Sequence, residues 1–250
     1  MLRCALYYNR VMTEFEKIDD NWTLIKNACR NTVNKKYSEK EPSEQFKKNL
    51  LIAEHSPIRL FNTYWRWKDI KYWVSQEWAR HKFEKFISTQ RNDRQQKYDR
   101  NKAPQDSPVN MDCSANMQNL IDVWRKRLCF QATPEARTLA EDFKVELSKT
   151  NPIESSVLVP NCIYRCGCPE INKCGFFQGF TKYIEEQGYI NSDLFDIQKR
   201  YDLYNEYFYL REFGLNKLLS RLEQPEEPLE MSTLVESMKE EARGGLKISE

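Results

Sequence analysis

The chain has 250 residues, enough for one large domain or for a domain with an appendage, and either can bury a substantial core. Its 39 basic and 37 acidic residues nearly balance, which argues against a general nucleic-acid or membrane-surface binder. No apolar run approaches the roughly 18 residues of a membrane span, and the first residues lack the apolar segment of a secretory signal. We therefore expect a cytoplasmic protein that binds neither nucleic acid nor membranes.

The N-terminal part of the chain predicts helices interrupted by one strand. Residues 10–36 and 46–52 are expected to be helical, with a polar loop between them. Residues 58–67 (IRLFNTYWRW) are rich in β-branched and aromatic side chains with partial alternation, which predicts a strand. From residue 69 to about residue 86 we expect a further helix.

The following part predicts a long loop and then more helices. Residues 88–115 are polar and poor in apolar side chains, which predicts a loop that is either functional or disordered. An amphipathic helix is expected over residues 115–128, and another begins near Pro134, a residue that suits a first helical turn. A cysteine-rich segment at 160–175 follows, and residues 201–222 predict a long aromatic helix.

The cysteine-rich segment marks a change in composition that predicts two parts. We expect a main domain over residues 1–175 and a helical C-terminal extension over residues 176–250. The end of this extension, beyond Pro225, is charged and is expected to be peripheral or partly disordered.

The chain has two histidines, His55 and His81, so acid–base chemistry depends on these two positions or on carboxylates. His81 lies between Arg80 and Lys82, and more arginines follow in the polar segment. Such a group of cations is costly unless anions bind there. The alternative is a solvated basic helix end, where cations complement the helix dipole.

A second candidate site lies on the amphipathic helix at 115–128. Asn116 and Arg127 are eleven residues apart, which at about 100° per residue places them within roughly 20° of the same helix face. An amide at one end of such a stripe and a guanidinium at the other can hold two parts of an extended ligand assembly. The alternative is that the basic end of this helix is simply solvated.

The third candidate is a metal site formed by four closely spaced cysteines: Cys162, Cys166, Cys168 and Cys174. Four thiols can supply a tetrahedral zinc site, and the intervening glycine and proline suit the tight turns that such sites need. The spacing differs from the usual paired C-x-x-C. Reduced structural cysteines are therefore the alternative.

The segment WARHKFEKFISTQRN resembles the signature R-H-R-x-x-S-x-N-E-x-S-x-R-Y of flavin-dependent thymidylate synthases, the ThyX family. Arg80 and His81 match its opening, and Lys82 takes the place of the next arginine. With one residue deleted, residues 89–92 match the closing S-x-R-Y, whereas the central N-E of the signature is missing from this chain.

Other stretches resemble the same family in the same order along the chain. Residues 54–57 resemble its H-x-S/T-P segment, and residues 116–127 resemble its N-x-R-S-L-x-x-F-x-x-L-R helix. Residues 132–135 lie where the family has A-Q-x-E, and residues 28–30 resemble its A-A-R segment. The segment between the signature and the Asn-to-Arg helix is shorter than in the family. The resemblance covers roughly residues 20–170.

The resemblance implies an α+β ThyX-like fold with a twisted sheet flanked by helices, to which a mainly helical C-terminal extension is added. It implies a thymidylate synthase, a methyltransferase that reductively methylates dUMP to dTMP. FAD is the implied cofactor, and NADPH and methylenetetrahydrofolate are the implied co-substrates. It also implies a homotetramer with sites at subunit interfaces, and a mechanism without a cysteine or serine nucleophile.

The same resemblance implies the site residues. Three residues are expected to bind the flavin: Arg80, His81 and Asn116. Three residues are expected to hold dUMP: Thr89, Arg91 and Arg127. Arg127 and His55 are the expected catalytic residues. Arginine suits the phosphate and uracil oxygens because its planar fork donates two hydrogen bonds at once.

Two other functions remain open at this stage. One is a divergent ThyX-like enzyme that modifies another pyrimidine nucleotide or transfers a hydroxymethyl group. The other is a non-catalytic interaction protein, stabilised by a metal at the cysteine segment. A flavoenzyme purifies yellow, whereas a colourless protein that holds zinc favours the interaction protein.

Overall fold

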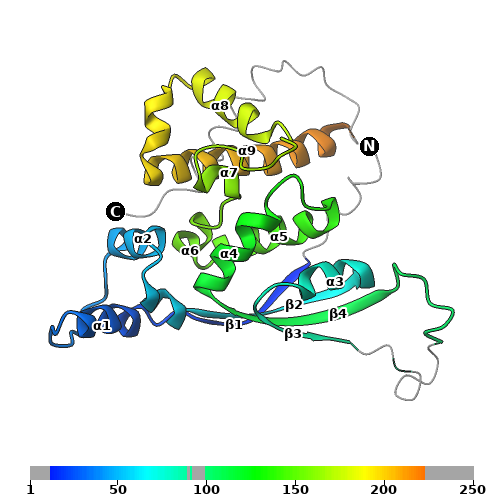
Figure 1. The fold of residues 1–250 in the computed structure, drawn as a ribbon, viewed down its shortest axis with the longest axis horizontal. Helices are drawn as coiled ribbons and strands as arrows, with labels where there is room; N and C mark the ends of the chain where they lie inside the picture. Colours follow the sequence, from blue (N-terminus) through cyan, green and yellow to red (C-terminus); the bar gives the residue numbers. More distant parts are fainter. Residues whose placement is uncertain (1–11, 89–90, 92–98, 223–250) are drawn as a thin grey trace. The chain divides into compact units, whose positions relative to one another are not determined.

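A computed structural model describes residues 12–88, 91 and 99–222 of the chain (Figure 1). The chain divides into two compact units. One unit comprises residues 10–174, and the C-terminal unit is described over residues 175–222. The two units are described separately below.

The larger unit is built on an antiparallel sheet with the strand order β1-β2-β4-β3. Its four strands are β1 (Thr13–Asp19), β2 (Asn62–Lys71), β3 (Glu84–Ile87) and β4 (Pro108–Asn116). In the central strand β2, Trp65 lies opposite Phe15 on one side and Cys113 on the other. Trp65 and Trp67 are buried on one face of the sheet. Tyr64 and Arg66 alternate with them along the strand and point to the other face, where Tyr64 is 47% exposed.

The helices of this unit provide the layer that covers the sheet. In chain order they are α1 (Trp22–Thr32), α2 (Glu44–Ile52), the short 3-10 helix η2 (Ser56–Leu60), α3 (Tyr72–Ala79), α4 (Met117–Arg127), α5 (Pro134–Ser148), α6 (Pro152–Ser156) and α7 (Asn161–Tyr164). Figure 1 shows α3, α4 and α5 on one face of the sheet, in agreement with their contacts to its strands. The mixed α+β class expected from the sequence is confirmed.

Polar side chains begin several of these helices, as the helix ends require. The side chains of Asn21, Ser43 and Asn116 each accept a hydrogen bond from the backbone N–H three residues further on. Pro134 and Pro152 open α5 and α6, where a missing N–H costs nothing.

A cluster of fully buried tryptophans lies between the sheet and the helices. Trp67 on β2 packs against Trp78 on α3, with ring centroids 4.7 Å apart. Trp78 in turn lies 5.5 Å from Trp124 on α4, and Trp124 lies 4.3 Å from Phe143 on α5. Each such ring buries a large apolar area, so this cluster ties three helices to the sheet.

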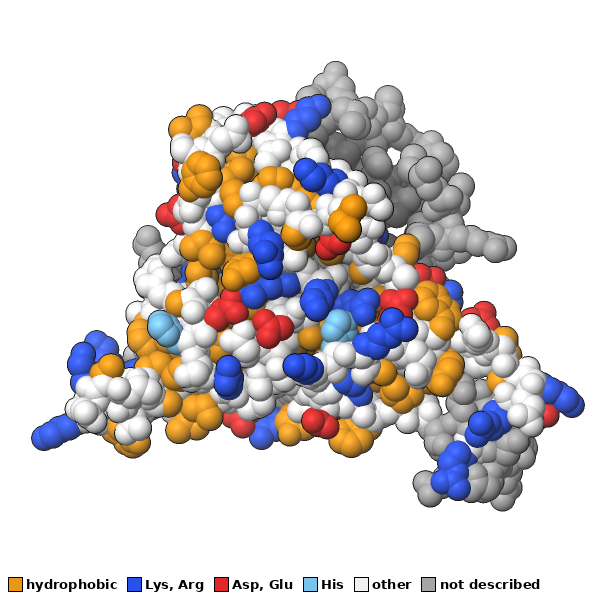
Figure 2. Space-filling model, viewed as in Figure 1, with side chains coloured by type: hydrophobic (Ala, Val, Ile, Leu, Met, Phe, Trp, Pro, Cys, Tyr) orange, Lys and Arg blue, Asp and Glu red, His pale blue; other side chains and the backbone are white. Residues whose placement is uncertain are grey.

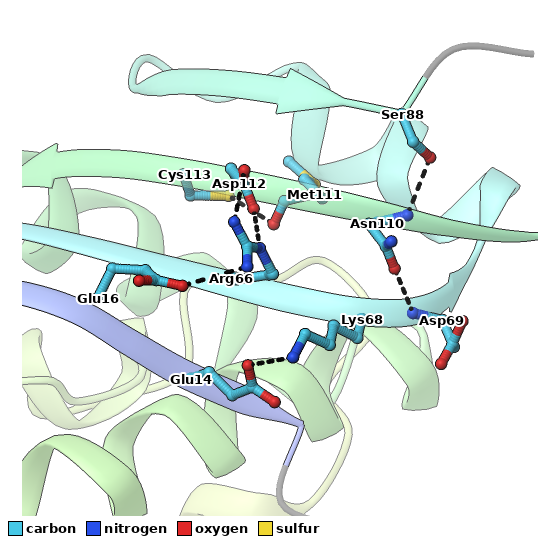
Figure 3. Close-up of polar contacts among 10 residues, drawn as sticks. All are labelled: Glu14, Glu16, Arg66, Lys68, Asp69, Ser88, Asn110, Met111, Asp112 and Cys113. Atoms are coloured by element: carbon cyan, nitrogen blue, oxygen red, sulfur yellow. Dashed lines mark hydrogen bonds and ion pairs between the residues drawn. The ribbon is translucent and has the colours of Figure 1, made fainter.

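The opposite face of the sheet carries charged side chains that pair across the strands (Figure 3). Arg66 binds Asp112 on β4 at 2.5 and 3.2 Å and Glu16 on β1 at 3.2 Å. Lys68 binds Glu14 at 2.6 Å. Exposed pairs of this kind each contribute little to stability, and their main effect is to specify which strands lie side by side.

The C-terminal unit consists, over its described residues, of α8 (Phe176–Glu186), the short 3-10 helix η3 (Asn191–Phe195) and α9 (Ile197–Leu222). Aromatic rings join the two long helices, and the Tyr183 and Tyr207 centroids lie 5.0 Å apart. The long aromatic helix expected at 201–222 is therefore confirmed. Among the residues that the structure describes, no helix is both long and apolar enough to cross a membrane.

Three sequence-based expectations in the larger unit are wrong. The helix expected over residues 10–36 begins only at Trp22, because residues 13–19 form the edge strand β1. The helix expected over 69–86 ends at Ala79, and residues 84–87 form β3. The loop expected over 88–115 contains most of strand β4. All three errors concern strands, whose partners lie far away in the sequence.

Trp124→Ala should lower the free energy of unfolding by about 3–5 kcal/mol, because it leaves a cavity in a closely packed core. It also removes the donor to the backbone oxygen of Ala140, which the indole N–H now binds at 2.9 Å. Urea unfolding followed by tryptophan emission measures this unit alone, since all six tryptophans lie between residues 22 and 124. Tyr64→Ala on the exposed sheet face is the matched control, and an equal loss in both variants would contradict the prediction.

Candidate functional site

Arg80 and His81 lie just beyond helix α3, in the turn that leads to β3. Arg80 is the C-terminal cap residue, and the N–H of His81 still binds the Trp78 oxygen at 3.1 Å. The chain then reverses, because the Phe83 N–H binds the His81 oxygen and the Lys85 ammonium binds the same oxygen. The expectation that these two residues are carried within a helix is therefore wrong, since α3 has already ended.

Arg127, at the end of α4, reaches this turn. Its Nε donates to His81 Nε2 over 2.6 Å. Its Nη2 donates to the Glu77 backbone oxygen at 2.9 Å, and its Nη1 lies 3.2 Å from the Glu77 carboxylate. Thr133, just before α5, donates to the same carboxylate at 2.8 Å. Two of the residues singled out in the sequence, 46 positions apart, are thus in direct contact.

This contact determines the protonation of His81. The guanidinium of Arg127 can only donate, so His81 Nε2 must be the unprotonated, accepting nitrogen. Burial and, less strongly, the charges of Arg127, Lys126 and Lys85 together lower the pKa of His81 to about 4. At neutral pH the ring is therefore uncharged and carries its proton on Nδ1.

A hollow of about 440 Å³ opens beside this turn. It is bordered by the end of α3, by α4 and by α7, and His81 lines it. Its lining contains five cationic side chains and one acidic side chain, Asp122: the cations are Arg80, Lys82, Arg125, Lys126 and Arg165. Figure 2 shows Lys and Arg side chains gathered around the middle of the face in view. A hollow lined in this way suits an anionic ligand.

One of these cations is held firmly by its neighbours. Arg125 binds the carboxylate of Glu54 and lies over the Tyr164 ring at 3.6 Å from the centroid. The same Glu54 accepts from the Gln118 amide at 2.7 Å. Glu54, which precedes η2, thus binds two residues of α4. Arg125 therefore has a fixed place in the wall of the hollow.

A second hollow, of about 500 Å³, is lined by Arg91 and by residues of α3. Its lining also includes Arg100, Tyr72 and Gln76. The two hollows share no lining residue. Thr89, the other expected nucleotide-binding residue of this segment, lies outside the described residues.

His55 and Asn116 are not among the residues that line the two hollows. His55 is exposed, precedes η2 and does not line either of these hollows. Asn116 is half-buried at the junction of β4 and α4, where its Oδ1 accepts from the Asn119 N–H at 3.0 Å. The amide nitrogen of Asn116 is therefore the part of its side chain that can serve a ligand.

The cysteine segment forms α7 and the loop that follows it. Burial and, less strongly, the nearby thiols of Cys129, Cys168 and Cys174 together raise the pKa of the Cys162 thiol to about 12. Cys129, at the end of α4, thus joins the segment in space. Among the described residues, no three His, Cys, Asp or Glu side chains are placed so that they could hold a metal ion.

Sequence reasoning missed three residues of this site: Glu77, Thr133 and Glu54. Glu77 lies four residues before His81, a spacing at which side chains meet on a helix, and this is the signal that was available. Thr133 and Glu54 lie in two of the motif-like segments, but their partners are more than 50 residues away, so the sequence did not predict their contacts.

Comparison with known proteins gives a limited result. No family model matches the chain, and no curated protein matches it. One similar solved structure is thymidylate synthase X (ThyX) from Helicobacter pylori with FAD and dUMP. Its superposition with this chain has a TM-score of 0.49 and 12% sequence identity. It covers 58% of this chain and 98% of that chain. Another similar structure is flavin-dependent thymidylate synthase ThyX from Helicobacter pylori complexed with FAD and dUMP. It has a TM-score of 0.45 and 13% sequence identity, and the match covers 54% of this chain and 92% of that chain. Similarity at this level identifies neither the family nor the activity of this chain.

The depressed pKa of His81 predicts a pH dependence of stability. Below about pH 6.5 the unfolded chain protonates this residue, whereas the folded chain does so only near pH 4. The free energy of unfolding should therefore decrease as the pH falls through this window. His81→Gln removes the titrating group, so its decrease should be smaller. Urea titrations at several pH values measure this, and parallel curves for the two proteins would contradict it.

Proposed function

We propose that the chain is a flavin-dependent thymidylate synthase of the ThyX type, which methylates dUMP reductively to dTMP. The observation that carries the proposal is the 2.6 Å hydrogen bond between Arg127 and His81. These residues come from two separate segments that resemble ThyX motifs, and local sequence resemblance does not require the segments to meet. Their contact brings the two motif-like segments together at one site within residues 10–174.

The hollow beside His81 fits FAD as the cofactor. Its cations suit the phosphates of a dinucleotide, and the neutral His81 ring offers a donor to the carbonyl oxygens and ring nitrogens of a flavin. FAD supplies the hydride-transfer chemistry when it is bound, and the residues of this chain bind and orient it. Arg80 and His81 line the hollow, and Asn116 is assigned to the flavin by resemblance.

The hollow that contains Arg91 and Arg100 is the proposed place for the phosphate of dUMP. Two arginines suit a phosphate because each can donate a pair of hydrogen bonds. In one chain Arg91 and His81 border different hollows. This separation supports a homotetramer in which residues of two subunits complete each site. NADPH and methylenetetrahydrofolate are the proposed co-substrates.

Flavin binding is the first test of the proposal. Purified protein should be yellow, or should take up FAD with a change in the flavin absorbance bands. Arg80→Ala should weaken FAD binding about tenfold or more, because it removes one cation from the lining of the hollow. Lys68→Ala, on the opposite sheet face, removes a cation that pairs with Glu14 and is the matched control. Protein that never binds FAD, and holds zinc instead, would favour the non-catalytic interaction protein.

Product formation is the second test. With FAD, NADPH, methylenetetrahydrofolate and dUMP, mass analysis should show dTMP, and the gene should rescue a thymidine-requiring bacterium. Arg91→Ala should raise the dUMP concentration needed for half-maximal rate about tenfold, since a phosphate contact is lost. A hydroxymethylated pyrimidine nucleotide as the product would instead identify the divergent ThyX-like enzyme. That alternative is considered because the N-E of the signature is missing from this chain. No product with bound FAD would refute the assignment of the reaction.

A further inference from the structure

The Arg127 guanidinium is held from two sides by groups of neighbouring elements. On one side Glu77 accepts two hydrogen bonds from the guanidinium: its carboxylate accepts one from Nη1 at 3.2 Å, and its backbone oxygen accepts one from Nη2 at 2.9 Å. On the other side its Nε faces His81 Nε2. Since Glu77 belongs to α3 and Arg127 to α4, the carboxylate of Glu77 acts together with its backbone oxygen to orient the guanidinium between the two helices.

Thr133 completes the arrangement from a third element. Its hydroxyl donates to the same Glu77 oxygen that faces Arg127. Thr133 precedes the first turn of α5 but does not cap that helix with its side chain. The hydroxyl is therefore used for Glu77 rather than for the end of its own helix.

The charges around His81 show why Glu77 is needed. Burial lowers the pKa of Arg127, and Arg80 lowers it further, whereas Glu77 acts in the opposite direction. The guanidinium therefore lies half-buried in surroundings that are otherwise positive, with Lys126 and Lys85 also acting on His81. Without a carboxylate partner, a half-buried cation turns toward solvent, where water can solvate it.

We propose that Glu77 is a positioning residue which, with Thr133, fixes Arg127 and thereby holds His81 as the Nδ1–H tautomer. His81 then presents a permanent hydrogen-bond donor to the hollow that it lines. The ligand atom that meets it must be an acceptor, such as a carbonyl oxygen or an unprotonated ring nitrogen. The inference rests on the proposed function only in naming the isoalloxazine ring of a flavin as the bearer of that atom.

The sign of one measurement separates this role from an ordinary ion pair. Removing a carboxylate near a histidine normally lowers the pKa of the histidine, because a negative charge is lost. If Glu77 acts through Arg127, its removal releases the guanidinium from Nε2, and the pKa of His81 rises instead. The two expectations have opposite directions, so either result is informative.

The experiment is a ¹⁵N NMR titration of the full-length protein without ligand. The chain has only two histidines, and His81→Gln assigns the signals of each. In the unaltered protein the His81 ring should show a protonated Nδ1 and an unprotonated Nε2 from neutral pH to about pH 5. Glu77→Ala should raise the pKa of His81 by about one pH unit or more and shift the ring toward the Nε2–H tautomer.

Three further variants complete the design. Glu77→Gln keeps an acceptor for Arg127 and Thr133, so it should preserve the Nδ1–H tautomer. Thr133→Val keeps the size of the side chain, and it should shift His81 in the same direction as Glu77→Ala but less. Glu14→Ala removes a carboxylate from the exposed pair with Lys68 and should leave the His81 signals unchanged. Tryptophan emission confirms that each variant is folded.

An unchanged or lowered pKa of His81 in Glu77→Ala overturns the inference. If Glu77→Ala does not fold, Thr133→Val decides, and unaltered His81 signals in that variant overturn it equally. In a protein that binds FAD, Glu77→Ala should also weaken FAD binding about tenfold, with recovery in Glu77→Gln. A protein with the expected tautomer that binds no flavin refutes the proposed function alone, because the NMR titration contains no ligand.

Discussion

The packing of Trp78 and Trp124 against each other is the contact on which the rest of the larger unit depends. Their rings, one on α3 and one on α4, lie 5.5 Å apart and are fully buried above strand β2. His81 lies three residues after Trp78, and Arg127 lies three residues after Trp124, so each polar residue follows its tryptophan by about one turn. The same core contact that fixes the two helices therefore also brings His81 and Arg127 together. The Arg127 guanidinium lies 5.6 Å from the centroid of the Trp78 ring.

This arrangement places polar groups at the edge of an apolar core, and their ionisation follows from that position. His81 stays neutral because burial and three neighbouring cations all oppose a positive charge on its ring. Arg127 stays charged, as a guanidinium does at ordinary pH, and the facing carboxylate of Glu77 offsets part of the cost of its burial. Cations that lie further out, such as Arg80 and Lys82, are exposed to solvent and are available to an anion. The site thus combines a neutral donor close to the core with positive charge at its rim.

Such a combination suits a ligand that carries both a hydrogen-bond acceptor and a negative charge. The histidine that lines the hollow is uncharged at neutral pH, and its Nε2 is occupied by the hydrogen bond from Arg127. Binding and orientation are what these residues can supply, and a bound cofactor would have to supply the reactivity. The cysteine segment adjoins this region through Cys129, but the raised pKa values of Cys129 and Cys162 keep both thiols protonated.

The sequence alone determined the helices whose signals are local, and it proposed the candidate site residues. Helices α2, α4, α5 and α9 were predicted because their signals are local: an amphipathic stripe, a proline in the first turn or a run of aromatic residues lies within the segment. Arg80, His81 and Arg127 were predicted as site residues from short motifs. Only the tertiary structure decided the strands β1, β3 and β4 and the contacts that Glu77 makes with Arg127 and Thr133. Strand pairing and the Thr133–Glu77 contact both depend on partners more than 20 residues away, which no local propensity encodes.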